Sequence, residues 1–169
     1  MFTVNIALMK RMGPLWKPIF GVVHAPVSRT TWLGGIDVPA TRITDAETSE
    51  ISVNRQTNTQ TRLVASGSHR AERDEKFAKE LGEHELVRMG SSLKACVVAE
   101  GSADLYPRFG PTSCWDIAAA HAVVEAAGGF VLSPQCEPLV YDLVDEVLNP
   151  YFLVACSTKW NDIWSQNQD

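Results

Sequence analysis

The chain has 169 residues, of which 45% are hydrophobic and 21% are charged, with a formal net charge of −5 at pH 7. This composition suits one soluble globular domain, or one domain with part of another, and excludes general disorder. The net negative charge argues against non-specific nucleic-acid binding, because no basic stripe exists to replace the counterions around phosphates. Any phosphate group that this protein recognises is therefore expected at a local site.

The N-terminal part contains short runs of strand-forming residues at hairpin spacing. Residues 2–9, 19–23 and 30–33 form these runs, with a turn around Gly13-Pro14 and with Gly34-Gly35 after the third run. They predict an antiparallel sheet. Because a strand pattern is present from residue 2, we expect a chain that starts inside a fold. Residues 1–20 lack the unbroken apolar stretch of a signal peptide or membrane span, so we expect a cytoplasmic protein, with peripheral association with the inner membrane left open.

A polar segment separates this sheet from the rest of the chain. Residues 36–61 are rich in Thr, Asn, Asp and Ser and have weak periodicity, which predicts an exposed connection with room for one edge strand. We place a domain boundary near its end. The predicted units are residues 1–61, a C-terminal α/β domain over 62–157, and a tail over 158–169.

From residue 62 the pattern becomes an alternation of strands and helices. The clearest helix covers residues 115–127, which are rich in alanine and are followed by Gly128-Gly129. Alternating elements of this kind predict α/β architecture. The other predicted helices cover residues 71–81 and 91–100, and the predicted strands cover 63–66, 85–89, 105–108, 130–132, 139–141 and 152–156.

The segment Gly90-Ser91-Ser92-Leu93-Lys94 joins a predicted strand to a predicted helix. Backbone N–H groups, two hydroxyls and an ammonium can converge there on an anion such as phosphate. The alternative is that a serine simply caps the helix and that Lys94 is solvated, since serine caps are common. Taken without its neighbours, the motif favours this second interpretation.

Three further positions are candidates for chemistry, each with a structural alternative. Asp116 opens the long helix, where a carboxylate either caps the backbone or ligates a hard cation. Ser66 and His69, in Ser66-Gly67-Ser68-His69, follow a predicted strand, the place where open α/β sheets contact ligands, although a loop histidine that only bonds backbone is as plausible. His121 lies in the middle of the helix and is expected to be packed or surface-exposed rather than catalytic.

The cysteines and the tail have simpler interpretations. Four widely spaced cysteines without a C-x-x-C motif are expected to be reduced core thiols. Trp160 and Trp164 lie four residues apart, so they could dock on a partner or membrane surface. Packing on the chain itself, or fraying, is favoured for so short a segment.

Several motifs together resemble those of one family, the bisphosphate nucleotidases of the CysQ type within the inositol monophosphatase superfamily. The resemblance covers nearly the whole chain except the polar connection and the tail. The order and spacing of its motifs are specific. The matching segments are Phe2-Thr3-Val4-Asn5-Ile6-Ala7-Leu8, Gly21-Val22-Val23-His24-Ala25-Pro26, Ser66-Gly67-Ser68-His69, Gly90-Ser91-Ser92-Leu93-Lys94, Leu105-Tyr106-Pro107-Arg108-Phe109-Gly110-Pro111-Thr112, Trp115-Asp116-Ile117-Ala118-Ala119 and Leu148-Asn149-Pro150.

The resemblance implies an αβαβα layered sandwich of the inositol monophosphatase type, with the N-terminal part missing. It implies magnesium-dependent hydrolysis of the 3'-phosphate of 3'-phosphoadenosine 5'-phosphate to AMP, in sulfur assimilation. Close relatives act as inositol phosphatases, which leaves that activity as an alternative. By position, the resemblance makes Asp116 a Mg²⁺ ligand and makes Ser66, His69, Gly90, Ser91 and Lys94 contacts to the nucleotide.

The sequence departs from the family pattern in its metal ligands. The motif Asp-Pro-x-Asp-Gly-Thr, expected upstream of Phe2, does not occur in these 169 residues. The catalytic residues that the resemblance implies are therefore unknown in this chain and are expected upstream of Met1. With Asp116 as the only expected ligand, a two-metal site cannot form from this chain as written.

The missing ligands lead to three expectations about the chain by itself. We expect it to have little or no phosphatase activity, because the metal site is incomplete. The alternative is a non-catalytic role in binding a nucleotide or a partner. Exposed apolar surface on the first sheet would favour a homodimer.

Overall fold

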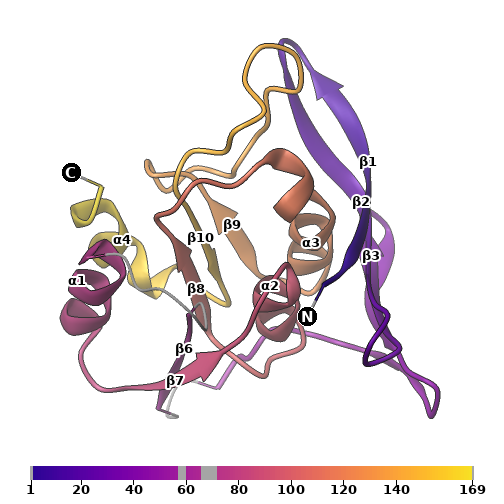
Figure 1. The fold of residues 1–169 in the computed structure, drawn as a ribbon, viewed down its shortest axis with the longest axis horizontal. Coiled ribbons are helices and arrows are strands. Elements are labelled where there is room, and N and C mark those ends of the chain that lie inside the picture. Colours follow the sequence, from indigo (N-terminus) through magenta and orange to yellow (C-terminus); the bar gives the residue numbers. More distant parts are fainter. Residues whose placement is uncertain (1, 57–59, 66–71, 169) are drawn as a thin grey trace.

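The computed structural model describes residues 2–56, 60–65 and 72–168, and these form alternating layers of helices and sheets (Figure 1). The first sheet is antiparallel, with the strand order β1-β2-β3-β4-β5. Val, Ile, Thr and aromatic residues, which favour strands, recur in most of these segments. Their bounds are β1 Val4–Met12, β2 Leu15–Ala25, β3 Thr30–Gly35, β4 Val38–Ile43 and β5 Thr48–Glu50.

The second sheet is mixed, with the strand order β7-β6-β8-β10-β9. Strand β6 runs parallel to β7 and β8, whereas β10 runs antiparallel to β8 and β9. The bounds of its strands are β6 Thr61–Ala65, β7 His84–Arg88, β8 Leu105–Arg108, β9 Phe130–Leu132 and β10 Phe152–Ala155.

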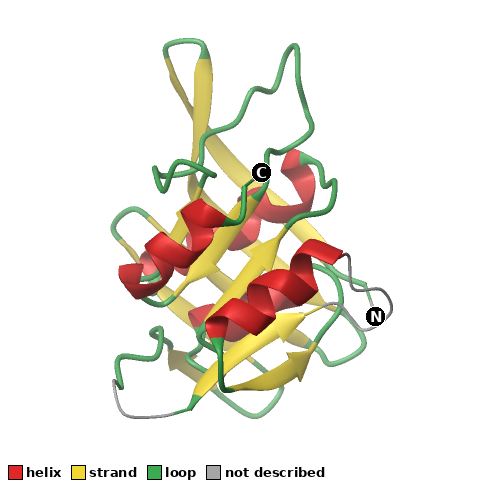
Figure 2. Ribbon diagram, turned by 90° about the vertical axis from the view of Figure 1, so that its left-hand side faces the viewer, coloured by secondary structure: helices red, strands yellow, loops and turns green. Residues whose placement is uncertain are grey.

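Helices separate and cover the two sheets. Helices α2 (Leu93–Ala99) and α3 (Cys114–Ala126) lie between them, and α1 (Glu72–Leu81) and α4 (Asn161–Gln166) lie on the far side of the second sheet, at the left of Figure 1. Figure 2, seen from the left of Figure 1, shows α1 and α4 in front, with the strands of the second sheet crossing behind them. The layered arrangement that the resemblance implied is confirmed, as helix, sheet, helix, sheet in the described residues.

Helix α3 is the centre of the larger core because it is buried on nearly all sides. Its alanines permit close approach to the first sheet, and Gly21 of β2 meets it so closely that an added Cβ would lie 2.0 Å from the carbonyl oxygen of Ala119. Only glycine fits at that crossing. The smaller core, between the second sheet and α1 with α4, contains Phe77, Phe109 and Trp164.

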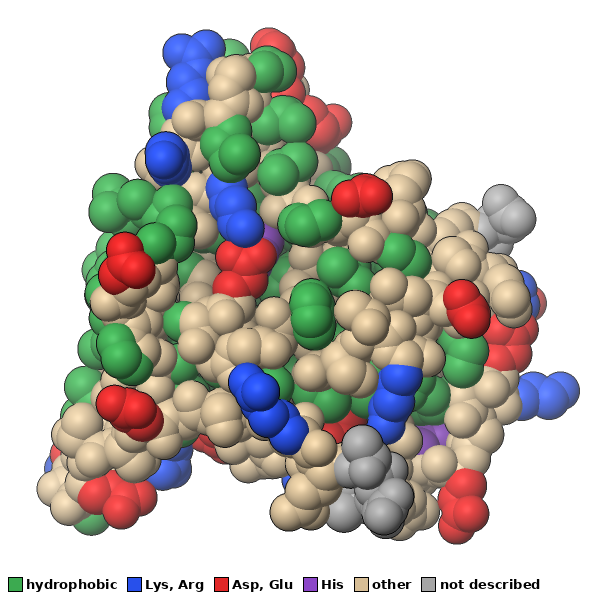
Figure 3. All heavy atoms as spheres, turned by 180° about the vertical axis from the view of Figure 1, so that it is seen from behind, with side chains coloured by type: hydrophobic (Ala, Val, Ile, Leu, Met, Phe, Trp, Pro, Cys, Tyr) green, Lys and Arg blue, Asp and Glu red, His purple; other side chains and the backbone are tan. Residues whose placement is uncertain are grey.

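The first sheet carries an apolar outer face. Val4, Ile6 and Leu8 alternate along β1 with side chains 49%, 66% and 57% exposed. Figure 3 shows hydrophobic side chains gathered along the side of the molecule that this sheet forms. In the described residues nothing packs over these three side chains. None of the helices in the described part of the chain is both long and apolar enough to span a membrane.

Two predictions about secondary structure were wrong. The polar connection forms two strands, β4 and β5, rather than one, because β4 pairs with β3 and β5 then pairs with β4. Residues 139–141 form no strand, because the chain there crosses between the sheets: Leu139 N donates to Val131 O of β9, and Tyr141 N donates to Trp16 O of β2. A segment that bonds two different sheets cannot continue either of them.

The structure also tests the predictions about the tail and the cysteines. Trp160 and Trp164 are 4% and 0% exposed, and Trp164 Nε1 donates to Ser133 O at 2.7 Å, so packing on the chain itself is confirmed. All four cysteines are free, as expected. Cys96 and Cys114 are buried, whereas the other two are only partly so.

Candidate active site

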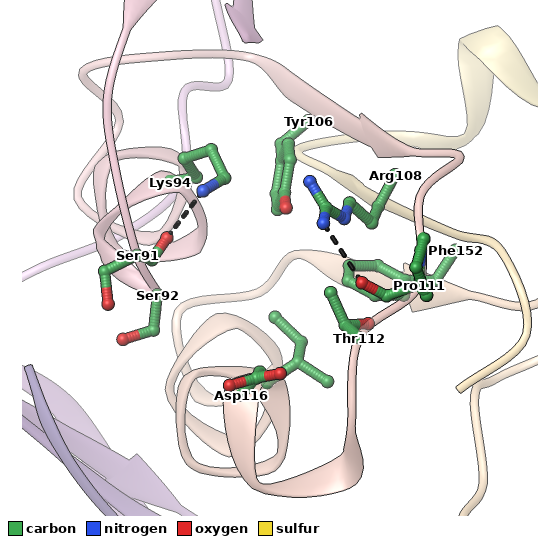
Figure 4. A pocket seen from close by; sticks show the side chains of 10 residues that line it. Ser91, Ser92, Lys94, Tyr106, Arg108, Pro111, Thr112, Asp116 and Phe152 are labelled. Atoms are coloured by element: carbon green, nitrogen blue, oxygen red, sulfur yellow. Dashed lines mark hydrogen bonds between the residues drawn. The ribbon is translucent and has the colours of Figure 1, made fainter. Parts of the chain in front are cut away.

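A pocket of 240 Å³ opens between the N-terminal ends of α2 and α3 and the end of β8 (Figure 4). Sequence segments up to 61 residues apart meet there because α2 and α3 lie side by side between the sheets and β10 pairs with β8. The pocket thus joins three of the motifs that carried the resemblance. It is lined by Ser91, Ser92, Lys94, Tyr106, Arg108, Pro111, Thr112, Asp116, Ile117 and Phe152.

Lys94 is the buried cation of the pocket. It is only 7% exposed, its Nζ donates to Ser91 O at 2.9 Å, and it lies 5.2 Å from the centre of the Tyr106 ring. Burial, followed by the positive charge of Arg108, lowers the pKa of Lys94 to about 8, although Asp116 acts in the opposite direction. The alternative of a solvated Lys94 is wrong, because its side chain is enclosed at the edge of the core.

Arg108 supplies a second cation, to which the sequence analysis gave no separate role. Its Nη2 donates to Pro111 O at 3.1 Å, while its buried Nε has no partner in the described residues. Neither Arg108 nor Lys94 forms an ion pair with a described carboxylate. The available signal was its place at the carboxyl end of a strand in an α/β domain, where ligand-binding side chains gather.

Asp116 caps its helix and also lines the pocket. Its Oδ2 accepts a hydrogen bond from Ser113 N at 2.9 Å, so the capping interpretation describes a real contact. Figure 4 shows the carboxylate across the pocket from Lys94 and Arg108. The two interpretations of Asp116 are therefore compatible.

Ser91 and Ser92 do not cap α2 through their side chains. Ser92 is at the N-cap position but has helical backbone angles and no capping bond. Its Oγ instead donates to Asn5 Oδ1 at 2.9 Å, and Thr3 Oγ1 lies 2.8 Å from Ser91 Oγ and 2.7 Å from Ser92 Oγ. The capping alternative is wrong for these side chains, and sequence reasoning missed Thr3 and Asn5 because both read as ordinary strand residues.

The other candidate residues have separate positions. Ser66 and His69 lie outside the described residues. Gly90 is partly buried and precedes the pocket without lining it, so its predicted contact with a nucleotide stays a prediction. His121 is 0% exposed, with Nδ1 2.8 Å from the Tyr141 hydroxyl, and its predicted packing is confirmed.

The catalytic residues expected upstream of Met1 are not among the positions that the structure describes. Met1 itself also lies outside the described residues, which begin at Phe2. No pair of carboxylates in the described part of the pocket takes their place, since Asp116 is the one carboxylate that lines it. The expected location of the catalytic residues therefore stays a prediction.

The described residues do not by themselves fit a magnesium site. The described part of the chain holds no group of three or more His, Cys, Asp or Glu side chains placed to bind a metal. Mg²⁺ needs an octahedral set of oxygen ligands, and the single carboxylate of Asp116 with a nearby hydroxyl falls short of it.

Comparison with known proteins identifies the family of this chain. The family model described as the inositol monophosphatase family matches residues 1–161. The chain belongs to the inositol monophosphatase family. Within that family, the 3'(2'),5'-bisphosphate nucleotidase CysQ of Escherichia coli strain K12 is 42% identical over 158 residues, covering 91% of this chain and 60% of that protein. The CysQ of Haemophilus influenzae is 30% identical and covers 98% and 62%.

Solved structures of family members agree. The crystal structure of CysQ from Bacteroides thetaiotaomicron superposes with a TM-score of 0.78 at 34% sequence identity, covering 92% of this chain and 63% of that one. The resemblance inferred from the motifs is confirmed. The chain spans about 60% of the length of the curated relatives it matches.

Proposed function

We propose that this protein is a phosphatase that removes the 3'-phosphate of 3'-phosphoadenosine 5'-phosphate to give AMP, with Mg²⁺, in sulfur assimilation. One observation carries the proposal: Lys94 and Arg108 line one pocket opposite Asp116, and neither cation has a carboxylate partner in the described residues. A buried ammonium and a partly buried guanidinium that lack a carboxylate partner suit an anionic ligand. The names of the CysQ relatives indicate which anion to test first.

The two cations suit different parts of phosphate recognition. The guanidinium of Arg108 is a planar fork that can meet two phosphate oxygens, whereas the ammonium of Lys94 is a compact charge held in place by Ser91 O. The edge-to-face pair Tyr106–Phe152 forms an apolar wall beside them. This wall excludes water and strengthens the attraction between the cations and a phosphate.

We expect the 169-residue chain itself to bind the nucleotide but to release phosphate at no more than a trace rate. The reason is the single carboxylate in the described pocket, since in-line displacement of a phosphate requires its developing charge to be neutralised on both the attacking and the leaving side. Binding and turnover are therefore separate expectations that need separate measurements.

The test measures both with purified chain. Phosphate release from 3'-phosphoadenosine 5'-phosphate is followed with and without Mg²⁺, using the E. coli relative as positive control, and AMP binding is measured by calorimetry. We expect saturable AMP binding and trace turnover. Turnover at the rate of the control would overturn our account of the metal site, and absence of saturable binding at millimolar AMP would overturn the proposed function. Tighter binding of inositol 1-phosphate than of AMP would favour the inositol phosphatase alternative.

A further inference from the structure

A chain of hydrogen bonds crosses the rim of the pocket from the first sheet to both central helices. Ser91 Oγ lies 2.8 Å from Thr3 Oγ1, which lies 2.7 Å from Ser92 Oγ. Ser92 Oγ is 2.9 Å from Asn5 Oδ1, and Asn5 Nδ2 is 3.4 Å from the backbone carbonyl oxygen of Trp115 in α3. Figure 4 shows the Ser91 and Ser92 hydroxyls side by side at the edge of the pocket.

The backbone carbonyl of Trp115, the last acceptor in this series of hydrogen bonds, fixes the orientation of the Asn5 amide. A carbonyl oxygen can only accept, so the amide nitrogen of Asn5 must face Trp115 O; the flipped amide would place two acceptors against each other. The amide oxygen of Asn5 therefore faces Ser92, and the Ser92 hydroxyl must donate to it.

Counting protons then fixes the remaining directions. Each hydroxyl has one proton to donate. Since the Ser92 proton goes to Asn5, the contact between Thr3 and Ser92 requires Thr3 to donate, and the contact between Thr3 and Ser91 requires Ser91 to donate. All bonds run the same way, from Ser91 toward α3, and such aligned bonds reinforce one another. The Ser91 oxygen is left with lone pairs only.

We propose that Thr3 and Asn5 are positioning residues that make Ser91 an acceptor toward the ligand, so that Ser91 recognises a free sugar hydroxyl next to the phosphate rather than the phosphate itself. This inference rests on the proposed function and adds a determinant of specificity to it. The phosphate oxygens, which can only accept, are left to Lys94 and Arg108 in the same pocket. A ligand hydroxyl supplies the one proton that the Ser91 position lacks.

The test compares two ligands that differ in this hydroxyl. Binding of adenosine 3',5'-bisphosphate and of its 2'-deoxy form is measured by calorimetry with EDTA present, so that no turnover occurs. A hydrogen bond to a neutral group contributes about 1 kcal/mol, so we expect the 2'-deoxy form to bind roughly fivefold to tenfold more weakly. Inorganic phosphate serves as a probe of the two cations alone.

Two variants free the hydroxyl proton of Ser91 in different ways. Thr3→Val removes the acceptor of the Ser91 proton, and Asn5→Leu frees Ser92 to donate back along the chain. In both, Ser91 regains a proton for phosphate, so we expect the discrimination to fall to about twofold or less while inorganic phosphate binds at least as tightly. Thr41→Val is the matched control, because the Thr41 hydroxyl bonds Pro39 O on β4, away from the pocket.

The outcomes separate the two proposals. Equal binding of the two nucleotides by the parent chain would overturn the role of Ser91 while leaving the proposed function intact. A preference that survives both variants would assign hydroxyl recognition to another group and overturn the inference as well. Failure of both nucleotides and of phosphate to bind would overturn the proposed function. Thermal melting of each variant checks that a lost preference reflects the pocket rather than unfolding.

Discussion

Two of the polar clusters in the described residues, one around Asp104 and one in the pocket, differ in how their charges are paired. Around Asp104, which is 3% exposed, every charge is matched: Arg62 donates three hydrogen bonds from its backbone and guanidinium, and Asn54 Nδ2 donates at 2.7 Å. In the pocket, Lys94 and Arg108 donate to backbone carbonyl oxygens and pair with no described carboxylate. Both clusters lie beside the second sheet. Within the described residues, the Asp104 carboxylate has an oppositely charged partner, whereas the two cations of the pocket do not.

On the proposed function, the difference separates a structural role, that of the Asp104 cluster, from a binding role, that of the pocket. Burial opposes ionisation of Asp104, but the hydrogen bonds from Arg62 and Asn54 outweigh it and lower the pKa of its carboxyl. That cluster joins the polar connection to the second sheet and has no need of a ligand. Lys94 experiences the reverse, since burial and Arg108 disfavour its charge. A site that holds cations at a cost to the folded protein is one that an anion completes.

The largest effect is expected from removing the charge of Asp104, which tests whether its cluster stabilises the fold. Asp104→Asn leaves the Arg62 guanidinium and the Arg62 backbone without their acceptor charge, so we expect a loss of about 3 kcal/mol in the free energy of unfolding, measured by urea denaturation. Asp45→Asn is the control, because its partner Arg29 and Asp45 itself are more than two-thirds exposed. A loss no larger than that of the control would show that the Asp104 cluster is not a structural one.

Removing a charge from the pocket should weaken phosphate binding and leave the stability of the fold unchanged. Lys94→Met keeps the length of the side chain and its contact with the Tyr106 ring. We expect phosphate affinity to fall by roughly 30-fold, because a charged hydrogen bond contributes about 2 kcal/mol. The free energy of unfolding should stay constant or rise slightly. If Lys94→Met is strongly destabilised but binds phosphate normally, Lys94 has a structural role like that of Asp104, and the contrast between the two clusters is wrong.

The smallest expected effect is the change in phosphate affinity with pH, which reports on the protonation of Lys94. On the proposed function the Lys94 ammonium binds phosphate, so affinity should be full just below pH 8, where the phosphate already carries its second negative charge, and should fall above pH 8 by up to about tenfold per unit. The parent chain and Lys94→Met are titrated in parallel by calorimetry, and only the parent should show the fall. For folding the sign is opposite: unfolded lysine keeps its proton to about pH 10.5, so the contribution of Lys94 to stability rises between pH 8 and that value.

Prediction from sequence succeeded where local pattern and tertiary environment agree. The alanine-rich helix was found because its residues favour a helix and its core position asks for small apolar side chains, and the strand at residues 105–108 was found with the bounds it has in the structure. The segments at 36–50 and 139–141 failed because their strand or non-strand state depends on which sheet each residue bonds. No local propensity carries that information.

The sequence by itself determined the family, the layered fold and the motifs that contain Lys94, Asp116 and Arg108, because motif order and spacing are properties of the chain. Only the tertiary structure decided that Lys94 is buried rather than solvated and that Thr3 and Asn5 direct the Ser91 hydroxyl. The physical reason is that burial and the direction of a hydrogen bond depend on neighbours nearly 90 residues away in the chain. A residue's type states what it can donate or accept, and the packing of distant segments settles what it does.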